Sequence, residues 1–127
     1  MFMLDTSVAI DLRDGSPEVT NRVQQLRGPV VLSIITRIEL EGGVHRIPGE
    51  AGLRRERLDT LLSVLPTVPF DDEAADIYRA IIETCGFSRR KMADRMIAAQ
   101  ALIEDATLVT LNPDDFRDIP GLKLLAW

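Results

Sequence analysis

The sequence predicts an α/β fold with a parallel, mostly buried sheet and helices on both of its faces. Short apolar, β-branched runs such as Val30–Ile34 are typical of strands that are covered on both sides. Segments with apolar residues at helical spacing lie between these runs. Strands that alternate with helices pair in parallel, because each helix carries the chain back to the same end of the sheet. In a chain of 127 residues without repeats or linkers, we expect one domain over residues 1–127.

The N-terminal segment predicts a strand and two helices. Phe2–Leu4 is a short apolar run, which we expect to form a buried strand. Residues 5–7, Asp-Thr-Ser, offer side-chain oxygens that can cap a helix over Val8–Arg13. Ser16 is a good N-cap and is followed by proline, which suits the first helical turn, so a second helix begins there. Its apolar stripe consists of Val19, Val23 and Leu26.

The next segment predicts a strand followed by a helix. After the strand Val30–Ile34, Thr36 suits the N-cap position and Glu39 stands three residues later, as in a capping box. Gly42 and Gly43 are unfavourable inside a helix, at about 1 kcal/mol each relative to alanine. We therefore expect either a bend at these glycines or another group that approaches the helix backbone closely.

The middle of the chain predicts two helices joined by a short extended piece. Residues 51–65 carry leucines at helical spacing, and residues 66–70 are extended. The acidic residues 71–73 suit the positive end of a helix that runs to Cys85 and stops at Gly86.

The C-terminal segment predicts one more helix and two strands. The helix covers Lys91–Leu102, and Thr107–Leu111 is an apolar, β-branched strand. Residues 112–116 form a loop or short helical turn, and residues 122–125 form the last strand.

The composition narrows the function classes. The net charge of −5 argues against broad electrostatic affinity for nucleic acid, although bound divalent cations reverse the local sign of an acidic site. No apolar run reaches the roughly 20 residues of a membrane helix, and Asp5 interrupts the N-terminal run, so we expect neither a membrane segment nor a signal peptide. The single cysteine, Cys85, excludes an internal disulfide and suits the reducing cytoplasm, where we expect the protein.

Asp94 is an acid on an otherwise apolar helix face. At helical spacing it is followed by Ile97, Ala98 and Ala101. A carboxylate is costly to bury there unless a cation or hydrogen bonds meet it. An ion pair with Arg90 or Arg95 is one explanation, and a metal site is the other.

Three further acids lie where strands end or helices begin. Asp5 follows the first strand, Glu39 lies one turn into the helix after the second, and Asp115 lies just past the third. Sites in open α/β sheets form at the carboxyl ends of the strands. Together with Asp94, these hard oxygen donors predict a site for one or two Mg²⁺ or Mn²⁺ ions.

Each acid also has a purely structural explanation when taken alone. Asp5 could be an N-cap, Glu39 a capping-box partner and Asp115 a turn residue. The metal hypothesis therefore depends on the set of four.

The same motifs, in this order, carry a resemblance that covers nearly the whole chain. The sequence resembles a PIN domain and, more narrowly, the VapC-type ribonuclease toxins of bacterial toxin–antitoxin pairs. The residues that carry the resemblance are Met3–Ser7, Ser33, Glu39, Leu40, Gly43, Asp94–Ala99, Leu108–Thr110, Asn112, Asp115, Phe116 and the closing G-L-K-L-L-A-W.

The resemblance implies a fold, a chemistry and partners. The fold would be a three-layer α/β/α sandwich with a short, mostly parallel central sheet. Asp5, Glu39, Asp94 and Asp115 would be the catalytic metal ligands, and the spacing T-x-N-x-x-D-F favours Asp115 over its neighbour Asp114. Thr6, Thr110 and Asn112 would support them. The substrate would be RNA, such as transfer RNA, a cognate antitoxin would block the site, and the toxin would form a homodimer.

A metal-activated water would cut the RNA in this hypothesis, leaving a 5′-phosphate and a 3′-hydroxyl. His45 is the only histidine, so a metal-free mechanism that needs two histidines is excluded. Two alternatives remain: a non-catalytic binding module with this fold, and an aspartate-dependent phosphoryl-transfer enzyme, although the D-x-D motif of one such class is missing after the first strand.

Basic and apolar surfaces complete the predictions. Arg89, Arg90, Lys91 and Arg95 flank Asp94 and are candidate RNA contacts, with a solvated helix face as the alternative. The arginines of the helix 51–65 more simply form such a solvated face. The leucines of that helix, with Val19, Val23 and Leu26, belong to the core or to a surface for an antitoxin helix or a second copy.

Overall fold

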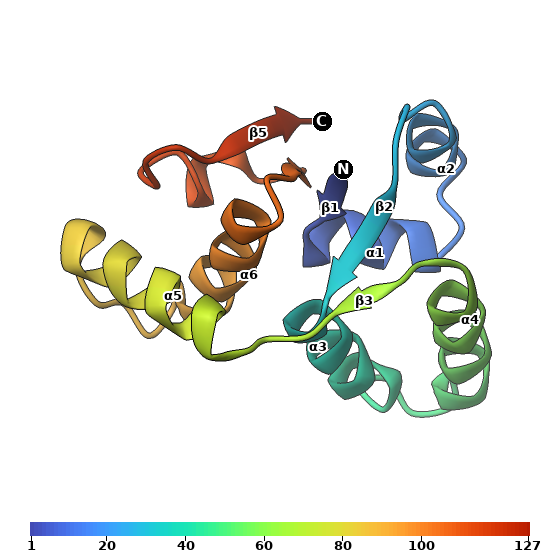
Figure 1. Ribbon diagram of the computed structural model, residues 1–127. Helices are drawn as coiled ribbons and strands as arrows, with labels where there is room; N and C mark the ends of the chain where they lie inside the picture. Colours follow the sequence, from blue (N-terminus) through green and yellow to red (C-terminus); the bar gives the residue numbers. More distant parts are fainter.

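The computed structural model describes all 127 residues and has a five-stranded parallel sheet at its centre (Figure 1). The strand order is β3-β2-β1-β4-β5, and every neighbouring pair is parallel. The strands are β1 Phe2–Leu4, β2 Val30–Ser33, β3 Thr67–Val68, β4 Thr107–Thr110 and β5 Lys123–Ala126. The parallel sheet expected from the apolar runs is confirmed.

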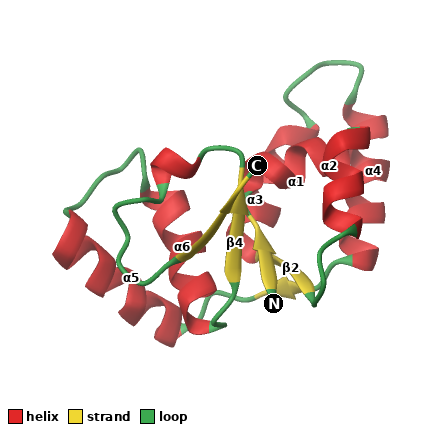
Figure 2. Cartoon of the chain, turned by 90° about the horizontal axis from the view of Figure 1, so that it is seen from above, coloured by secondary structure: helices red, strands yellow, loops and turns green.

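Six helices cover the two faces of the sheet, which gives the expected α/β/α sandwich. They are α1 Thr6–Arg13, α2 Pro17–Gln24, α3 Ile34–Val44, α4 Ala51–Val64, α5 Asp72–Cys85 and α6 Met92–Ile103. Figure 2 shows α5 and α6 on one side of the strands and α1, α2 and α4 on the other. None of these helices combines the length and apolar character that crossing a membrane requires.

Alternation along β1 divides the core into two halves. Met3 packs into the cluster that contains Ile97 and Ala98 of α6, whereas the next residue, Leu4, packs into the cluster that contains Val8 of α1. Successive side chains of a strand point to opposite faces, so both faces of this sheet are buried.

Gln100 holds α6 against the sheet. It is 1% exposed, accepts a hydrogen bond from Ser33 Oγ and donates to the carbonyls of Val68 and Pro69 at 2.9 Å each. One side chain thus joins the ends of β2 and β3 to the helix that carries Asp94.

The structure corrects the predicted start of α3. The strand β2 ends at Ser33, whose hydroxyl accepts a hydrogen bond from the Ile35 amide at 2.9 Å and caps the helix. Thr36 is therefore the third residue of α3 and fully buried, and Glu39 is not its capping-box partner. Ser33 and Thr36 can both cap a helix. Because β2 ends at Ser33 and not at Ile34, Ser33 takes the cap position.

The close approach expected at the paired glycines occurs at Gly43. Its carbonyl accepts a hydrogen bond from Arg54 Nη1 at 2.7 Å. A Cβ added at Gly43 would lie 3.5 Å from Arg13 Nη1, whereas no atom lies near Gly42. Two arginines therefore lie against the last turn of α3, where the helix dipole favours positive charge.

The order of the strands fixes where a site can form. From β1 the chain continues to β2 on one side, and from β4 it continues to β5 on the other. In such sheets a crevice opens beyond the carboxyl ends of the two strands at which the direction changes. Asp5 directly follows β1, and Thr110 is the last residue of β4.

Candidate functional site: four carboxylates at the strand ends

Asp5 links the first strand, the first helix and β4. It is 4% exposed, and its Oδ1 accepts hydrogen bonds from the Val8 amide at 3.1 Å and the Ser7 hydroxyl at 2.5 Å. Its Oδ2 accepts a hydrogen bond from the Thr110 hydroxyl at 2.5 Å. Burial raises the pKa of Asp5, and these hydrogen bonds oppose the rise. Asp5 is thus the N-cap of α1, as its structural explanation required, and it also points toward the crevice between β1 and β4.

Glu39 approaches the same crevice from α3. Its Oε1 accepts a hydrogen bond from the Thr6 hydroxyl at 2.6 Å, and the hydroxyls of Thr6 and Thr36 lie 3.1 Å apart. The Glu39 side chain is exposed, whereas Thr36 is fully buried. The two threonines hold the glutamate on the side of α3 that faces Asp5.

Asp94 lies in the first turn of α6 and forms no ion pair, so the expected alternative of a bridge to Arg90 or Arg95 is wrong. Its pKa is raised to about 6 by burial and then by the negative charges of Asp115, Asp5 and Glu39. Lys91 opposes this rise but does not cancel it. Four carboxylates from distant parts of the chain therefore repel one another across one small region.

The segment after β4 brings Asp115 into this group. A short 3₁₀ helix, η1 Pro113–Asp115, follows the strand, and Asp115 contributes the largest charge effect on Asp94. Asp114 is exposed and pairs with Arg117 instead. The backbone amide of Asn112 donates to the Thr110 hydroxyl at 2.9 Å. The Asn112 side chain is exposed and makes no hydrogen bond within the protein.

The donor chemistry of this cluster fits a hard divalent cation, but the cluster is not a finished cage. Carboxylate, hydroxyl and amide oxygens are the ligands that Mg²⁺ and Mn²⁺ prefer. No group of three His, Cys, Asp or Glu side chains lies in an arrangement that could hold an ion as it stands. Asp5 and Glu39 accept hydrogen bonds from hydroxyl groups of Thr6, Ser7 and Thr110.

The four basic residues around Asp94 fall into two groups. Arg89 and Arg90 are exposed and form no ion pair, and Lys91 Nζ lies 3.9 Å from Asp118 Oδ2. Arg95 is only 3% exposed: its guanidinium donates to the Gly86 carbonyl and to Asp118, and its Nε has no partner. Arg95 was expected as a candidate RNA contact, and its guanidinium is buried against Gly86 and Asp118 instead of facing solvent.

Sequence reasoning missed the second role of Ser7. Its hydroxyl donates to Asp5 and accepts from the Leu111 amide at 3.2 Å, so it joins the start of α1 to the end of β4. The signal was present in the run Asp5-Thr6-Ser7, but a cap explained that run equally well. Thr36 and Asp118 were missed because their partners, Thr6 and Arg95, are distant in the sequence.

Comparisons with known proteins agree with this geometry. The family model described as PIN domain matches residues 2–122. The chain is 31% identical to a protein named Ribonuclease VapC from Rickettsia bellii, over 98% of this chain and 94% of that protein. It is 30% identical to one named Ribonuclease VapC2 from Rickettsia felis, over 100% and 98% of the two chains.

Solved structures show the same arrangement of the backbone. VapBC2 from Rickettsia felis, bound to a DNA fragment from its promoter, matches with a TM-score of 0.87 and 28% identity, over 99% of this chain and 98% of that chain. FitAcB from Neisseria gonorrhoeae matches with a TM-score of 0.82 and 28% identity, over 98% and 96% of the chains. With its parallel sheet, its carboxylates at the strand ends and these relatives, the chain belongs to the PIN-domain family and, within it, to the VapC ribonucleases.

Proposed function

We propose that the protein is a divalent-metal-dependent endoribonuclease that serves as the toxin of a bacterial toxin–antitoxin pair. Its membership of the VapC ribonucleases supports the activity. The observation that carries the chemistry is the raised pKa of Asp94, a carboxyl that faces three other carboxylates and forms no ion pair with a cation of this chain. Four acids so arranged are tolerable when a cation lies among them.

In this proposal Asp5, Glu39, Asp94 and Asp115 hold one or two Mg²⁺ or Mn²⁺ ions. The bound ion supplies a water that is acidic near neutral pH and a positive charge for the phosphate. Thr110 and Ser7 keep Asp5 in place through its two oxygens, and Thr6 positions Glu39. The exposed amide of Asn112 adds a neutral oxygen donor beside Asp115. Because Glu39 now accepts from Thr6, its side chain would turn toward the ion on binding.

The protein itself offers no competing nucleophile. His45 is exposed and is the C-cap residue of α3. The thiol of Cys85 donates to the Asp118 carbonyl at 3.3 Å and lies outside the group of acids. Hydrolysis by water therefore fits the cluster better than a covalent intermediate.

RNA, and transfer RNA in particular, is the proposed substrate, with the cytoplasm as the compartment. Arg89 and Arg90 are exposed next to Asp94, and Lys91 is partly exposed beside them. Phosphate contacts by such side chains position a strand without reading its sequence. Residues 1–127 would perform this function as one domain.

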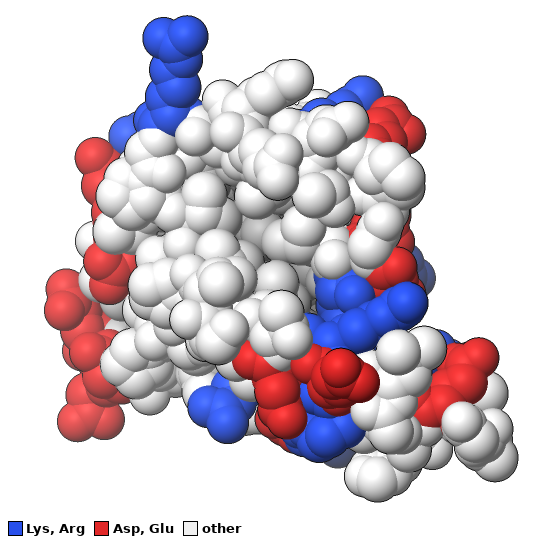
Figure 3. Space-filling view, turned by 90° about the vertical axis from the view of Figure 1, so that its right-hand side faces the viewer, with Lys and Arg blue, Asp and Glu red and all other residues white.

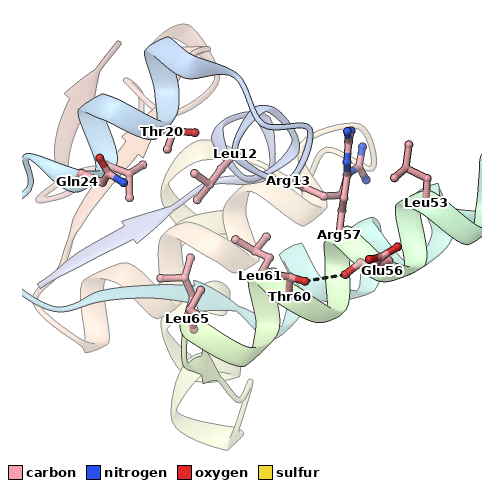
Figure 4. Close-up of a pocket in the computed structure, with 12 residues that line it drawn as sticks. Leu12, Arg13, Thr20, Gln24, Leu53, Glu56, Arg57, Thr60, Leu61 and Leu65 are labelled. Atoms are coloured by element: carbon pink, nitrogen blue, oxygen red, sulfur yellow. Dashed lines mark hydrogen bonds between the residues drawn. The ribbon is translucent and has the colours of Figure 1, made fainter.

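An apolar groove between α1, α2 and α4 is the proposed docking surface for the antitoxin. The groove has a volume of about 460 Å³, and Figure 4 shows Leu12, Leu61 and Leu65 directed into it. Leu53 and Val64 of α4 line the groove and are 51% and 68% exposed. Figure 3 shows a broad uncharged area on this side of the molecule, with charged side chains along its margins. An amphipathic helix binds such a groove through its apolar face, and the related structures are described as VapBC or toxin–antitoxin complexes.

Three exposed apolar side chains are the proposed contacts of the homodimer. Ile38 of α3 is 59% exposed, Met92 at the start of α6 is 41% exposed, and the two helices are neighbours. Phe87, in the loop before α6, is 69% exposed. Light scattering of Phe87→Ser tests this surface: a shift from dimer to monomer supports it, and an unchanged mass rejects it.

The function is tested by incubating the purified protein with total RNA in Mg²⁺, in Mn²⁺ and in excess chelator, followed by sequencing of the RNA ends. We expect cleavage only with metal, with 5′-phosphate and 3′-hydroxyl ends. RNA binding without cleavage under all three conditions would favour the non-catalytic module. Cleavage that persists in chelator would contradict the role of the four acids.

A further inference from the structure

A second cavity is lined by Glu39, one of the four acids. It has a volume of about 380 Å³ and opens between α1, α3 and α4. Thr6, which donates to Glu39, also lines it, so the cavity meets the acidic site at this pair of side chains. The rest of its wall contains three arginines and exposed isoleucines, namely Arg13, Arg46, Arg54, Ile10 and Ile47. Only Arg13 also belongs to the apolar groove of Figure 4.

Arg13 is a buried cation with free donors. Its side chain is 4% exposed, and its Nε pairs with Asp14 Oδ1 at 3.0 Å. Neither terminal nitrogen forms a hydrogen bond within the protein, yet neither is sealed from solvent, because Arg95 Nε is the only sealed donor without a partner. Nη1 lies beside Gly43, which also lines the cavity. Burying a guanidinium with unpaired donors is costly, and an anion in the cavity would relieve that cost.

The other two arginines play different parts. Arg54 has a structural role, since it donates to the Gly43 carbonyl at 2.7 Å and its Nε lies 3.4 Å from Glu50. Arg46 is exposed and forms no ion pair. The wall also contains Asp14 and Glu39, whose carboxylates already accept from Arg13 and Thr6. Arg13 and Arg46 are therefore the cations left to bind a ligand, in a chain whose net charge is −5.

We propose that this cavity binds the phosphate of the RNA nucleotide next to the scissile one, with Arg13 and Arg46 as donors. The inference rests on the proposed ribonuclease function. A strand whose scissile phosphate lies at the acids must leave the site on some side, and Glu39, one of the four acids, lines this cavity together with its partner Thr6. Guanidinium groups match phosphate oxygens in geometry and charge. The exposed parts of Ile10 and Ile47 offer an apolar surface for the ribose or base.

The site is tested without metal by following backbone amide NMR signals while uridine 3′,5′-bisphosphate is added, with uridine as the phosphate-free control. We expect saturable shifts at Gly43 and Arg46 with the bisphosphate and none with uridine. In Arg46→Gln the affinity should fall about tenfold, as expected for one charged contact. Arg79→Gln is the matched control, because it makes the same charge change on α5 at an exposed position on the opposite face of the sheet.

Steady-state cleavage of a short fluorescent oligoribonucleotide with Mg²⁺ then ties the cavity to the substrate. Arg46→Gln should raise KM several-fold, with the loss in KM and not in kcat, while Arg79→Gln matches the wild type. Arg13→Gln should show the same pattern, and its melting temperature reports any loss of packing. Arg46→Gln changes an exposed residue, so this variant still decides the test if Arg13→Gln does not fold.

Three results would overturn the proposal. The first is that the bisphosphate shifts no amide signal at the cavity, and the second is that Arg46→Gln keeps the wild-type affinity and KM. The third is that Arg46→Gln loses antitoxin binding while its RNA binding stays intact. The last would assign the cavity to a protein partner. If the wild type cleaves no RNA with either metal, the ribonuclease proposal fails, and the NMR titration still decides whether the cavity takes phosphate.

Discussion

Glu39 and Glu41 stand two residues apart on α3, yet they belong to regions with opposite electrostatics. Glu41 faces α4, where Arg55 Nη1 lies 2.6 Å from it, and Arg55 Nη2 pairs with Asp59 at 2.6 Å. Hydrogen bonding and charge from Arg55 lower the pKa of Glu41. Glu39 faces Asp94, whose pKa is raised to about 6 in the company of other carboxylates. The acids beside α4 are satisfied by this chain, whereas the acids at the strand ends are not.

The difference teaches how to distinguish a structural acid from a ligand. Exposed ion pairs such as that of Arg55 contribute at most about 1 kcal/mol each, and they need nothing from outside the protein. A cluster of partly buried carboxylates costs stability, and the fold keeps it only if something else compensates. Substitutions that neutralise one acid in each region separate the two cases.

The largest effect is expected from Asp94→Asn. The rate of RNA cleavage should fall by more than about 100-fold. Replacing a residue that only orients a metal ligand already lowers metal affinity or activity by about 10- to 100-fold, and Asp94 is a proposed ligand itself. A time course of cleavage of total RNA in Mg²⁺ measures this. Glu41→Gln, which removes a carboxylate of the α4 region, is the control and should cleave at the wild-type rate. A normal rate in Asp94→Asn would remove Asp94 from the proposed ligands.

The next effect concerns Thr110→Val, which deletes the hydroxyl that donates to Asp5 with little change in shape. Because Asp5 then loses one of its orienting partners, cleavage should fall about 10- to 100-fold. The free energy of unfolding should fall by about 1–3 kcal/mol, since the hydrogen bond is buried and its acceptor is charged. Chemical denaturation and the same cleavage assay measure the two quantities. Wild-type cleavage together with the expected destabilisation would show that Thr110 is purely structural.

A smaller effect is expected on stability as pH changes in metal-free buffer. The pKa of Asp94 is raised from 3.8 to about 6 in the folded state, so the unfolded chain ionises first as pH rises. Between pH 4 and pH 6, the free energy of unfolding of the wild type should fall by about 1–2 kcal/mol relative to that of Asp94→Asn, after allowance for solvent screening. Urea denaturation at several pH values measures this difference in unfolding free energy between the two proteins. A difference that stays constant over this range would show that the pKa of Asp94 is not raised.

The smallest effect is expected from Glu41→Gln itself. Its lowered pKa means that the carboxylate stabilises the folded state above its ordinary pKa of 4.5 and loses that contribution as pH falls. Because the pair with Arg55 is exposed, the unfolding free energy at pH 7 should change by less than about 1 kcal/mol. A larger loss of unfolding free energy would mean that the acids of the α4 region are as dependent on their surroundings as the acids at the strand ends.

The strands were predictable because they depend on local patterns, and the four acids were singled out by their places near strand ends and helix starts. Runs such as Val30–Ile34 specify buried strands by themselves, and the parallel order places Asp5 at the same edge as the segment that follows β4. The start of α3 was mispredicted because Ser33 and Thr36 are both good caps, and only the end of β2 decides between them.

Long-range contacts explain the rest of what the sequence hid. Arg95 carries the same charge as Arg89 and Arg90, but it packs against Gly86 and Asp118, and no pattern along the chain reveals that. The cation-lined cavity depends on Arg13, Arg46 and Arg54 meeting from separate elements. Such surfaces follow from tertiary packing and become visible only in the folded chain.

Above all, we propose that the carboxylates at the strand ends share a divalent cation. The most direct measurement is anomalous diffraction from crystals soaked in Mn²⁺. We predict a manganese peak bounded by oxygens of Asp5, Asp94 and Asp115, with Glu39 turned toward it and away from Thr6. Saturating Mn²⁺ with no peak at this position, or a peak only at the ion pairs of α4, would contradict the claim.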